Sequence, residues 1–88
     1  MAAYEDLDLH GTRPDPGRVG FLLQEALLRA RRGHRGLRVI HGRGEFVLAR
    51  LAQAWLQTQQ LEFEQGVFNP GETRIAAPTV QRWKKAAG

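Results

Sequence analysis

The chain has 88 residues and a mass of 9.9 kDa, which is enough for one small domain with one hydrophobic core. Its hydrophobic fraction of 42% and charged fraction of 25% are typical of a folded protein and argue against a disordered one. Cysteine is absent, which excludes disulfides, thiol nucleophiles and cysteine-ligated metal centres, and serine is absent, which excludes a serine nucleophile. No apolar run approaches the roughly 20 residues that cross a bilayer, and no signal-peptide pattern is visible, so we expect a cytoplasmic protein without a membrane partner.

Positive charge gathers in the middle of the chain. Arginine supplies eleven of the thirteen basic residues, and the formal net charge is +4. Between Arg29 and Arg50 there are seven arginines and one acid, Glu45, which gives a local charge of +6. Because guanidinium groups bind phosphate through two parallel hydrogen bonds, this pattern favours a nucleic-acid partner. The alternative is a solvated arginine-rich surface that binds nothing.

In chain order, the first expected element is a strand at residues 7–10, where apolar and polar side chains alternate. Asp15 followed by Pro16 predicts the start of a helix, with Asp15 as its N-cap, and Gly33 is its expected end. Residues 37–41 predict a second strand.

The second half of the chain continues the alternation of elements. A second helix is expected after the glycine-rich turn at 42–44, with an apolar stripe along one face: Leu48, Leu51, Ala52, Trp55 and Leu56. Residues 61–65 alternate again and predict a third strand, residues 69–71 predict a turn, and residues 79–83 predict the last strand.

The order β-α-β-α-β-β predicts an α/β fold, a two-layer sandwich in which two helices cover one face of a mixed four-stranded sheet. A helical crossover makes the first two strands parallel, so His10 and His41 both follow a strand at the same edge of the sheet. Ligands of open α/β sheets bind at that edge. We therefore expect the two imidazoles to converge on one anion-facing pocket.

The first cluster of candidate residues is Asp8 and His10, which share one face of the first predicted strand. A carboxylate there can fix the tautomer of the imidazole and raise its basicity. A polar strand end with two solvated side chains is the alternative. A zinc site that also uses His41 is disfavoured, because the chain has no helical His pair or acidic cluster.

The second cluster is His41-Gly42-Arg43-Gly44, between a strand and a helix. Its glycines let backbone N–H groups approach an anion, the helix start adds partial positive charge, and Arg43 adds a formal charge. The stretch lacks the third glycine of a dinucleotide fingerprint and the Gly-Lys-Ser/Thr of a P-loop, so nucleotide cofactors are disfavoured. An ordinary glycine-rich turn is the alternative. Trp83, near the basic end of the chain, either stacks on a base or simply packs.

Leu7-Asp8-Leu9-His10-Gly11 and His41-Gly42-Arg43-Gly44, at this spacing, resemble the two motifs of the Smr (small MutS-related) domain. The resemblance covers roughly residues 5–83 of a single domain and leaves a basic tail at 84–88. It implies an α/β sandwich similar to the C-terminal domain of bacterial translation initiation factor three. Smr domains occur as stand-alone proteins or at the ends of mismatch-repair-like or RNA-associated proteins. Several of them nick DNA or cleave RNA.

The resemblance implies a nucleic-acid-binding endonuclease that cleaves phosphodiester bonds in DNA or RNA by nicking or structure-selective cleavage. A non-catalytic nucleic-acid-binding module is the alternative. His41 is the hypothesised general base or acid, with Asp8 and His10 orienting it or moving the second proton. The candidate phosphate-binding residues are Gly42, Arg43, Gly44, Arg13, Arg38 and Arg74.

No tightly bound cofactor is expected, although a hydrated Mg²⁺ can accompany the substrate. A homodimer or a larger parent protein is the expected way for so small a domain to hold a duplex. The chain departs from the family at one place, because Smr domains usually carry a Gly-Gly-x-Gly-Ala stretch before the last strand. The best match is Thr73-Arg74-Ile75-Ala76-Ala77, where every glycine is replaced, so a bulkier loop with altered substrate access is expected.

Overall fold

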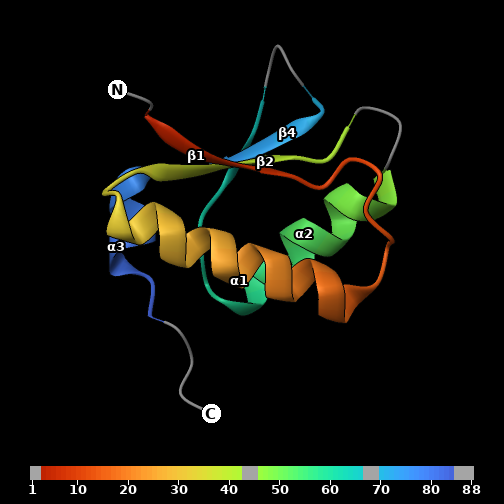
Figure 1. The fold of residues 1–88 in the computed structure, drawn as a ribbon, viewed down its shortest axis with the longest axis horizontal. Coiled ribbons are helices and arrows are strands. Elements are labelled where there is room, and N and C mark those ends of the chain that lie inside the picture. Colours follow the sequence, from red (N-terminus) through yellow and green to blue (C-terminus); the bar gives the residue numbers. More distant parts are fainter. Residues whose placement is uncertain (1–2, 43–45, 67–69, 85–88) are drawn as a thin grey trace.

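The computed structural model describes residues 3–42, 46–66 and 70–84. Its sheet has the strand order β1-β2-β4-β3, with β1 and β2 parallel and the other two pairs antiparallel. The elements are β1 (Tyr4–Asp8), α1 (Pro16–Arg32), β2 (Gly36–Ile40), α2 (Phe46–Thr58), β3 (Glu64–Gln65), β4 (Glu72–Ile75) and α3 (Ala77–Arg82). Figure 1 shows α1 and α2 on one side of the sheet, which confirms the predicted α/β sandwich.

The helix α1 follows its sequence signals closely. The Asp15 carboxylate accepts the backbone N–H of Arg18 at 3.1 Å, as an N-cap does, and Pro16 opens the helix. The helix ends where the N–H of Gly33 donates to the carbonyl of Arg29 at 3.1 Å. Its buried face packs against the sheet and α2 and carries Val19, Gly20, Leu23, Ala26, Leu27 and Ala30.

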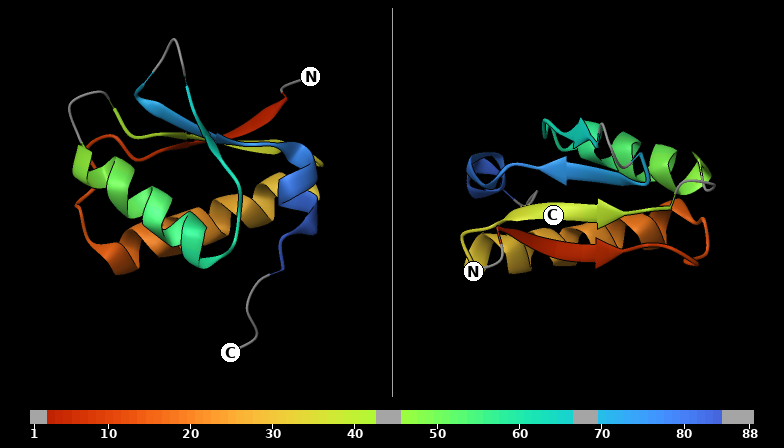
Figure 2. Two further views of the ribbon diagram at one scale, coloured as in Figure 1. Left: turned by 180° about the vertical axis from the view of Figure 1, so that it is seen from behind. Right: turned by 90° about the horizontal axis from the view of Figure 1, so that it is seen from above.

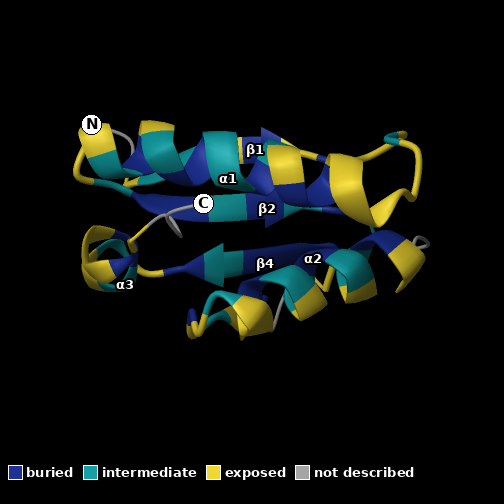
Figure 3. Cartoon of the chain, turned by 90° about the horizontal axis from the view of Figure 1, so that it is seen from below, coloured by how far each residue is buried: buried dark blue, intermediate teal, exposed yellow. Residues whose placement is uncertain are grey.

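The hydrophobic core lies between the sheet and the two long helices, as the burial colours of Figure 3 show. Strand alternation sorts the side chains of β1 and β2: Leu7 and Val39 are buried on the covered face, whereas Asp6 and Asp8 are exposed on the open face. This alternation decides which candidate residues can meet on one side of the sheet. Among the described residues, no helix has the length and apolar character needed to cross a membrane.

The prediction of a last strand at residues 79–83 is wrong, because α3 occupies this part of the chain. Pro78 fits the first turn of that helix, where its missing N–H is not needed, and Val80 is buried. The last strand is instead β4, in which Thr73 and Ile75 face the core while Arg74 faces the open side. Short alternating segments of this kind are easily assigned to the wrong element, since their pairing with β2 is not local.

The predicted third strand at 61–65 is also shorter than expected. Only Glu64 and Gln65 pair with β4. Gln60 adopts a φ of 58°, and the N–H of Leu61 donates to the carbonyl of Leu56 at 3.0 Å, which closes the end of α2. Leu61 therefore belongs to the helix end rather than to the strand.

Candidate functional site

The two motifs leave the sheet side by side at one edge. Asp8 is paired with Ile40 in the parallel ladder, and the N–H of Leu9 donates to the carbonyl of Ile40 at 2.7 Å. The expectation that both motifs follow neighbouring parallel strands is confirmed. Figure 2 shows β1 and β2 pointing to the end of the molecule where α1 and α2 begin. We call this end the carboxyl edge, and it consists of residues 9–15 and 41–42 with the first turns of α1 and α2.

His10 lies in a tight turn on the surface of this edge. Asp8 Oδ1 accepts the backbone N–H of His10 at 2.9 Å, and the N–H of Thr12 donates to the carbonyl of Leu9 at 2.8 Å. Gly11 has a φ of 81°, a conformation that favours glycine. The Asp8 carboxylate thus fixes the backbone that carries His10, and the His10 side chain is exposed.

The His41 side chain lies in the interior, with 1% of its surface exposed. Its Nε2 is 2.9 Å from Thr73 Oγ1, and its Nδ1 is 3.3 Å from the carbonyl oxygen of Gly42. The Gln53 amide of α2 donates to the same Thr73 Oγ1 at 3.1 Å. The Thr73 hydroxyl can therefore donate to Nε2, which leaves Nδ1–H facing the Gly42 carbonyl and gives both ring nitrogens of His41 a partner.

The expectation that both imidazoles face one open pocket is not met by His41. Alternation along β2 places His41 on the covered face with Leu37 and Val39. Alternation along β1 places Asp8 on the open face, so Asp8 and His41 lie on opposite sides of the sheet. Both motifs reach the shared edge, as predicted, but the side chains of Asp8 and His41 point to opposite faces because these residues have opposite parity along their paired strands.

His41 and Gly42, which follow β2, are held by backbone contacts to the segment before β4. The N–H groups of His41 and Gly42 both donate to the carbonyl of Gly71, at 2.8 Å and 3.0 Å, and Gly42 has a φ of 85°. Arg43 and Gly44, the other two predicted phosphate-binding residues of this motif, lie outside the described residues. The backbone at Gly42 is therefore fixed by its hydrogen bond to Gly71.

The region before the last strand also differs from the prediction. Thr73, Arg74 and Ile75, which match the family's glycine-rich stretch before the last strand, lie within the last strand β4 itself. The expectation of a bulkier loop at these residues is therefore wrong, and Arg74 stands on a strand. Thr73 and Gln53 were missed as site residues. The alternation of side chains along residues 72–75 could have indicated that Thr73 faces the covered side of the sheet. Nothing local in the sequence indicates Gln53.

The predicted phosphate-binding arginines occupy two different places. Arg13 is exposed in the loop between β1 and α1, at the carboxyl edge. Arg38 and Arg74 lie opposite each other on the open face of the sheet. Arg38 donates to both carboxylate oxygens of Asp6, at 2.8 Å and 2.9 Å, and this hydrogen-bonded pair lowers the pKa of Asp6.

The charge of the two open-face arginines is partly compensated. Glu72 lies between them, with a carboxylate oxygen 3.5 Å from Arg74 Nε and another 3.9 Å from Arg38 Nε. Asp6 is the second acid within ion-pair distance of these arginines. Arg13 makes no such side-chain contact with any described residue. A phosphate that binds the Arg13 guanidinium therefore displaces no ion pair between described residues, unlike one that binds Arg38 or Arg74.

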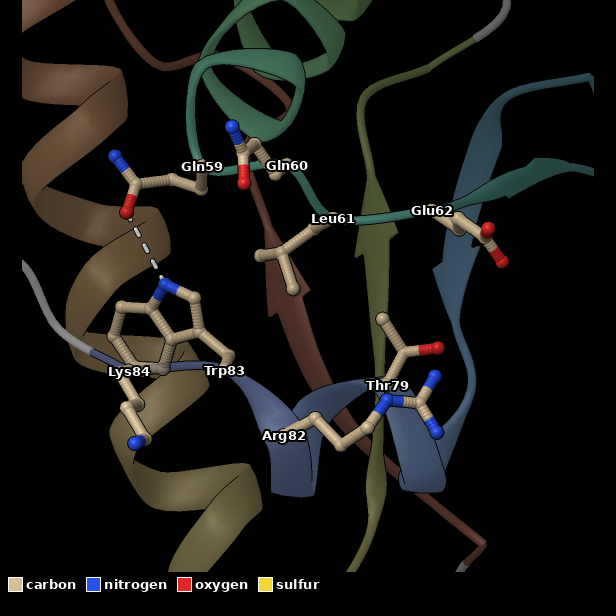
Figure 4. Close-up of a pocket in the computed structure, with 8 residues that line it drawn as sticks. All are labelled: Gln59, Gln60, Leu61, Glu62, Thr79, Arg82, Trp83 and Lys84. Carbon is tan, nitrogen blue, oxygen red and sulfur yellow. Dashed lines mark hydrogen bonds between the residues drawn. The ribbon is translucent and has the colours of Figure 1, made fainter.

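A pocket of about 470 Å³ lies at the junction of the α2–β3 connection and α3, away from both motifs (Figure 4). It is lined by Gln59, Gln60, Leu61, Glu62, Thr79, Arg82, Trp83 and Lys84. Trp83 is 4% exposed, its Nε1–H donates to Gln59 Oε1 at 3.1 Å, and the Arg31 guanidinium carbon lies 5.2 Å from the ring centroid. Trp83 therefore packs, which decides between its two predicted roles.

Within the described parts of the chain, no group of three or more His, Asp or Glu side chains is arranged to hold a metal ion. Comparison with known proteins gives one result. Residues 7–73 match the family model of the Smr domain, a span that includes both motifs and ends at Thr73, the residue bonded to His41. No curated protein matches the chain.

Proposed function

The chain belongs to the Smr domain family, which is known for nucleic-acid binding and, in some members, nuclease activity; from this premise we propose that it binds DNA or RNA at the carboxyl edge and cleaves phosphodiester bonds there. Cleavage is by nicking or by selection of a nucleic-acid structure. The observation that carries the proposal is the exposed His10 turn beside the Gly42 turn, held together by the parallel pairing of β1 and β2.

Binding is supported by the electrostatics of this edge. Helix α2 begins here, and the first N–H groups of a helix lack intrahelical acceptors and carry partial positive charge. Helix α1 also begins here, but the Asp15 carboxylate already caps its N-terminus. Arg13 adds a full charge in the same loop region, and the net charge of +4 favours the approach of a polyanion. In this proposal, the Arg43 side chain and the backbone N–H of Gly44 also contact the phosphate.

Proton transfer is assigned to His10, because it is the imidazole of the two motifs that a substrate can reach. In hydrolysis, the attacking oxygen loses a proton as it bonds to phosphorus, and the leaving oxygen gains one as its bond to phosphorus breaks. One imidazole at the surface can serve in either step. Such a general acid or base raises the reaction rate by about 10²–10⁴-fold. Asp8 holds the His10 backbone in place, and the N–H groups at the start of α2 stabilise the charge on phosphorus.

His41 is proposed as a positioning residue instead of a general base. Its ring ties the end of β2 to Thr73 of β4 and, through Thr73, to Gln53 of α2. Loss of this ring loosens the Gly42 turn and lowers both the rate and the stability of the fold. Loss of His10 lowers the rate alone. The temperature of unfolding therefore separates the two roles.

The second candidate function is a non-catalytic nucleic-acid-binding module. It is favoured by one observation, the burial of His41 with both ring nitrogens near protein oxygens. That burial leaves one exposed imidazole in the two motifs for a reaction that moves two protons. In the catalytic case, the water on a hydrated Mg²⁺ brought by the substrate would supply the second proton.

Nicking of supercoiled plasmid and cleavage of structured RNA by the purified chain test the proposal. His10→Asn is the main variant, and His34→Asn is its matched control, because His34 is an exposed histidine at the other end of α1. We expect His10→Asn to lower cleavage by about 10²–10⁴-fold with unchanged affinity and unchanged unfolding temperature, and His34→Asn to change none of these.

Cleavage by His10→Asn at the rate of the unmodified chain would refute the catalytic assignment. Absence of nicking above a mock purification, with salt-dependent binding retained, would establish the non-catalytic module. Absence of binding to both nucleic acids at low salt would refute both candidates. Addition of a chelator to the same reactions tests the role of Mg²⁺.

A further inference from the structure

Two phenylalanines are exposed on the helices that begin at the carboxyl edge, Phe46 within that edge and Phe21 one turn beyond it. Phe46, the first residue of α2, is 71% exposed, and Phe21, in the second turn of α1, is 59% exposed. Figure 1 shows that the first turns of the two helices lie at the same end of the molecule, beyond the ends of β1 and β2. Neither ring contributes to the hydrophobic core, which is filled by other side chains of the same helices.

Each ring has an exposed arginine on the same side of its helix. Arg18 precedes Phe21 by three positions, and Arg50 follows Phe46 by four positions. Residues three or four apart are neighbours on a helix surface. Neither Arg18 nor Arg50 takes part in an ion pair within the described segments. Both helices thus present an aromatic ring next to a guanidinium group that has no ion-pair partner among the described residues.

An aromatic ring beside a free cation suits an unpaired nucleotide. The base stacks on the ring while the guanidinium group neutralises the adjacent phosphate, and every base offers such a face. Bases within a duplex are already stacked and paired, so their faces cannot reach a protein ring. The same pair of groups therefore distinguishes single strands from duplexes without reading their sequence.

We propose that Phe46 and Phe21 form a stacking surface for unpaired bases, so that the nucleic acid bound at the carboxyl edge is single-stranded or carries unpaired nucleotides beside the cleaved bond. This inference rests on the proposed function, because it names the substrate class for that edge. Phe46 is the principal residue, since it follows Gly42 by only four positions and is the more exposed ring.

Fluorescence anisotropy with a labelled thymidine oligonucleotide, a uridine oligonucleotide and a blunt duplex of equal length tests the inference on the full chain. We expect Phe46→Ala to weaken single-strand binding by about 5- to 100-fold and to leave duplex affinity unchanged. Val47→Ala is the matched control, because Val47 is the next residue and is 58% exposed but has no ring. It should leave both affinities unchanged.

Phe46→Trp allows a measurement that would not change if residue 46 had only a structural role. It should retain single-strand affinity, and the added indole emission should be quenched by the single strand but not by the duplex. Circular dichroism and the unfolding temperature of Phe46→Ala should match those of the unmodified chain, since the ring is largely exposed.

The outcomes separate this inference from the function on which it rests. Equal losses on single strand and duplex, or no loss on either, overturn the stacking surface while leaving nucleic-acid binding established. Failure of the unmodified chain to bind any of the three probes overturns the proposed function itself. A dimer that dissociates on Phe46→Ala substitution with unchanged single-strand affinity overturns the inference in favour of contact between two copies.

Discussion

The imidazole Nε2 of His41 and the hydroxyl Oγ1 of Thr73 lie 2.9 Å apart in the interior, joining the end of β2 to β4. Because Gln53 donates to the same hydroxyl at 3.1 Å, one threonine oxygen links two strands of the sheet to α2. This buried contact holds the end of β2, where the second motif begins.

The first prediction is that Thr73→Val destabilises the fold. Valine keeps the shape of threonine but removes the hydroxyl, so His41 and Gln53 lose a buried partner. We expect the free energy of unfolding to fall by about 1–3 kcal/mol in urea titrations. Thr79→Val, at a partly buried position without a side-chain hydrogen bond to a described residue, should change it by less than about 0.5 kcal/mol. Equal losses for the two variants would contradict the role given to the cluster.

The second prediction compares two glycines of α1. A Cβ at Gly20 would lie 2.8 Å from Cδ1 and Nε1 of Trp55 in α2, whereas a Cβ at Gly17 would meet only Asp15 Oδ2, at 3.7 Å. Gly20→Ala should therefore cost about 1–3 kcal/mol through overpacking, and Gly17→Ala should add about 0.5 kcal/mol through lower chain entropy in the unfolded state. Thermal and urea unfolding measure both. The same sign for the two substitutions would refute the close contact between the helices.

The third prediction concerns acid and the pair Asp6–Arg38. Hydrogen bonding to Arg38 lowers the pKa of Asp6 below its ordinary value of 3.8, so the pair stabilises the fold above that pH. The contribution disappears as the pH falls through the pKa of the folded state. Asp6→Asn should be less stable than the unmodified chain near neutral pH, by less than about 1 kcal/mol because both side chains are largely exposed.

Urea titrations across the acid range provide the measurement for this pair. The difference between Asp6→Asn and the unmodified chain should shrink to nothing in strong acid, where the Asp6 carboxylate is protonated. Arg38→Gln should show the same dependence on pH, since it removes the other partner. A difference that stays constant from neutral to acidic pH would exclude the ion pair as its source.

The fourth prediction separates the candidate phosphate-binding arginines. Arg13 lies at the carboxyl edge without an acidic partner among the described residues, whereas Arg38 is held by Asp6 on the open face of the sheet. Arg13→Gln should reduce the slope of log affinity against log salt by about 1, and Arg38→Gln should leave it nearly unchanged. Binding titrations at several salt concentrations give both slopes. A larger change for Arg38→Gln would place the nucleic acid on the open face.

Much of the fold followed from local signals. The N-cap of α1 at Asp15 and the buried stripe of α2 were predicted because they depend on residues within one or two turns. The final strand was misplaced because β4 has only four residues, and the segment after it, which was predicted as the strand, forms α3 instead. Pairing of β4 with β2 selects between them, and that pairing spans more than thirty residues of chain.

By itself, the sequence determined that two histidine motifs follow two strands joined by a helix, and thus that both reach one edge of a parallel pair. Only the tertiary structure decided that His10 is exposed while His41 is buried against Thr73. The physical reason is the side-chain alternation of strands: a residue's face depends on the register in which its strand packs against the helices, and the partners that settle that register lie far away in the chain.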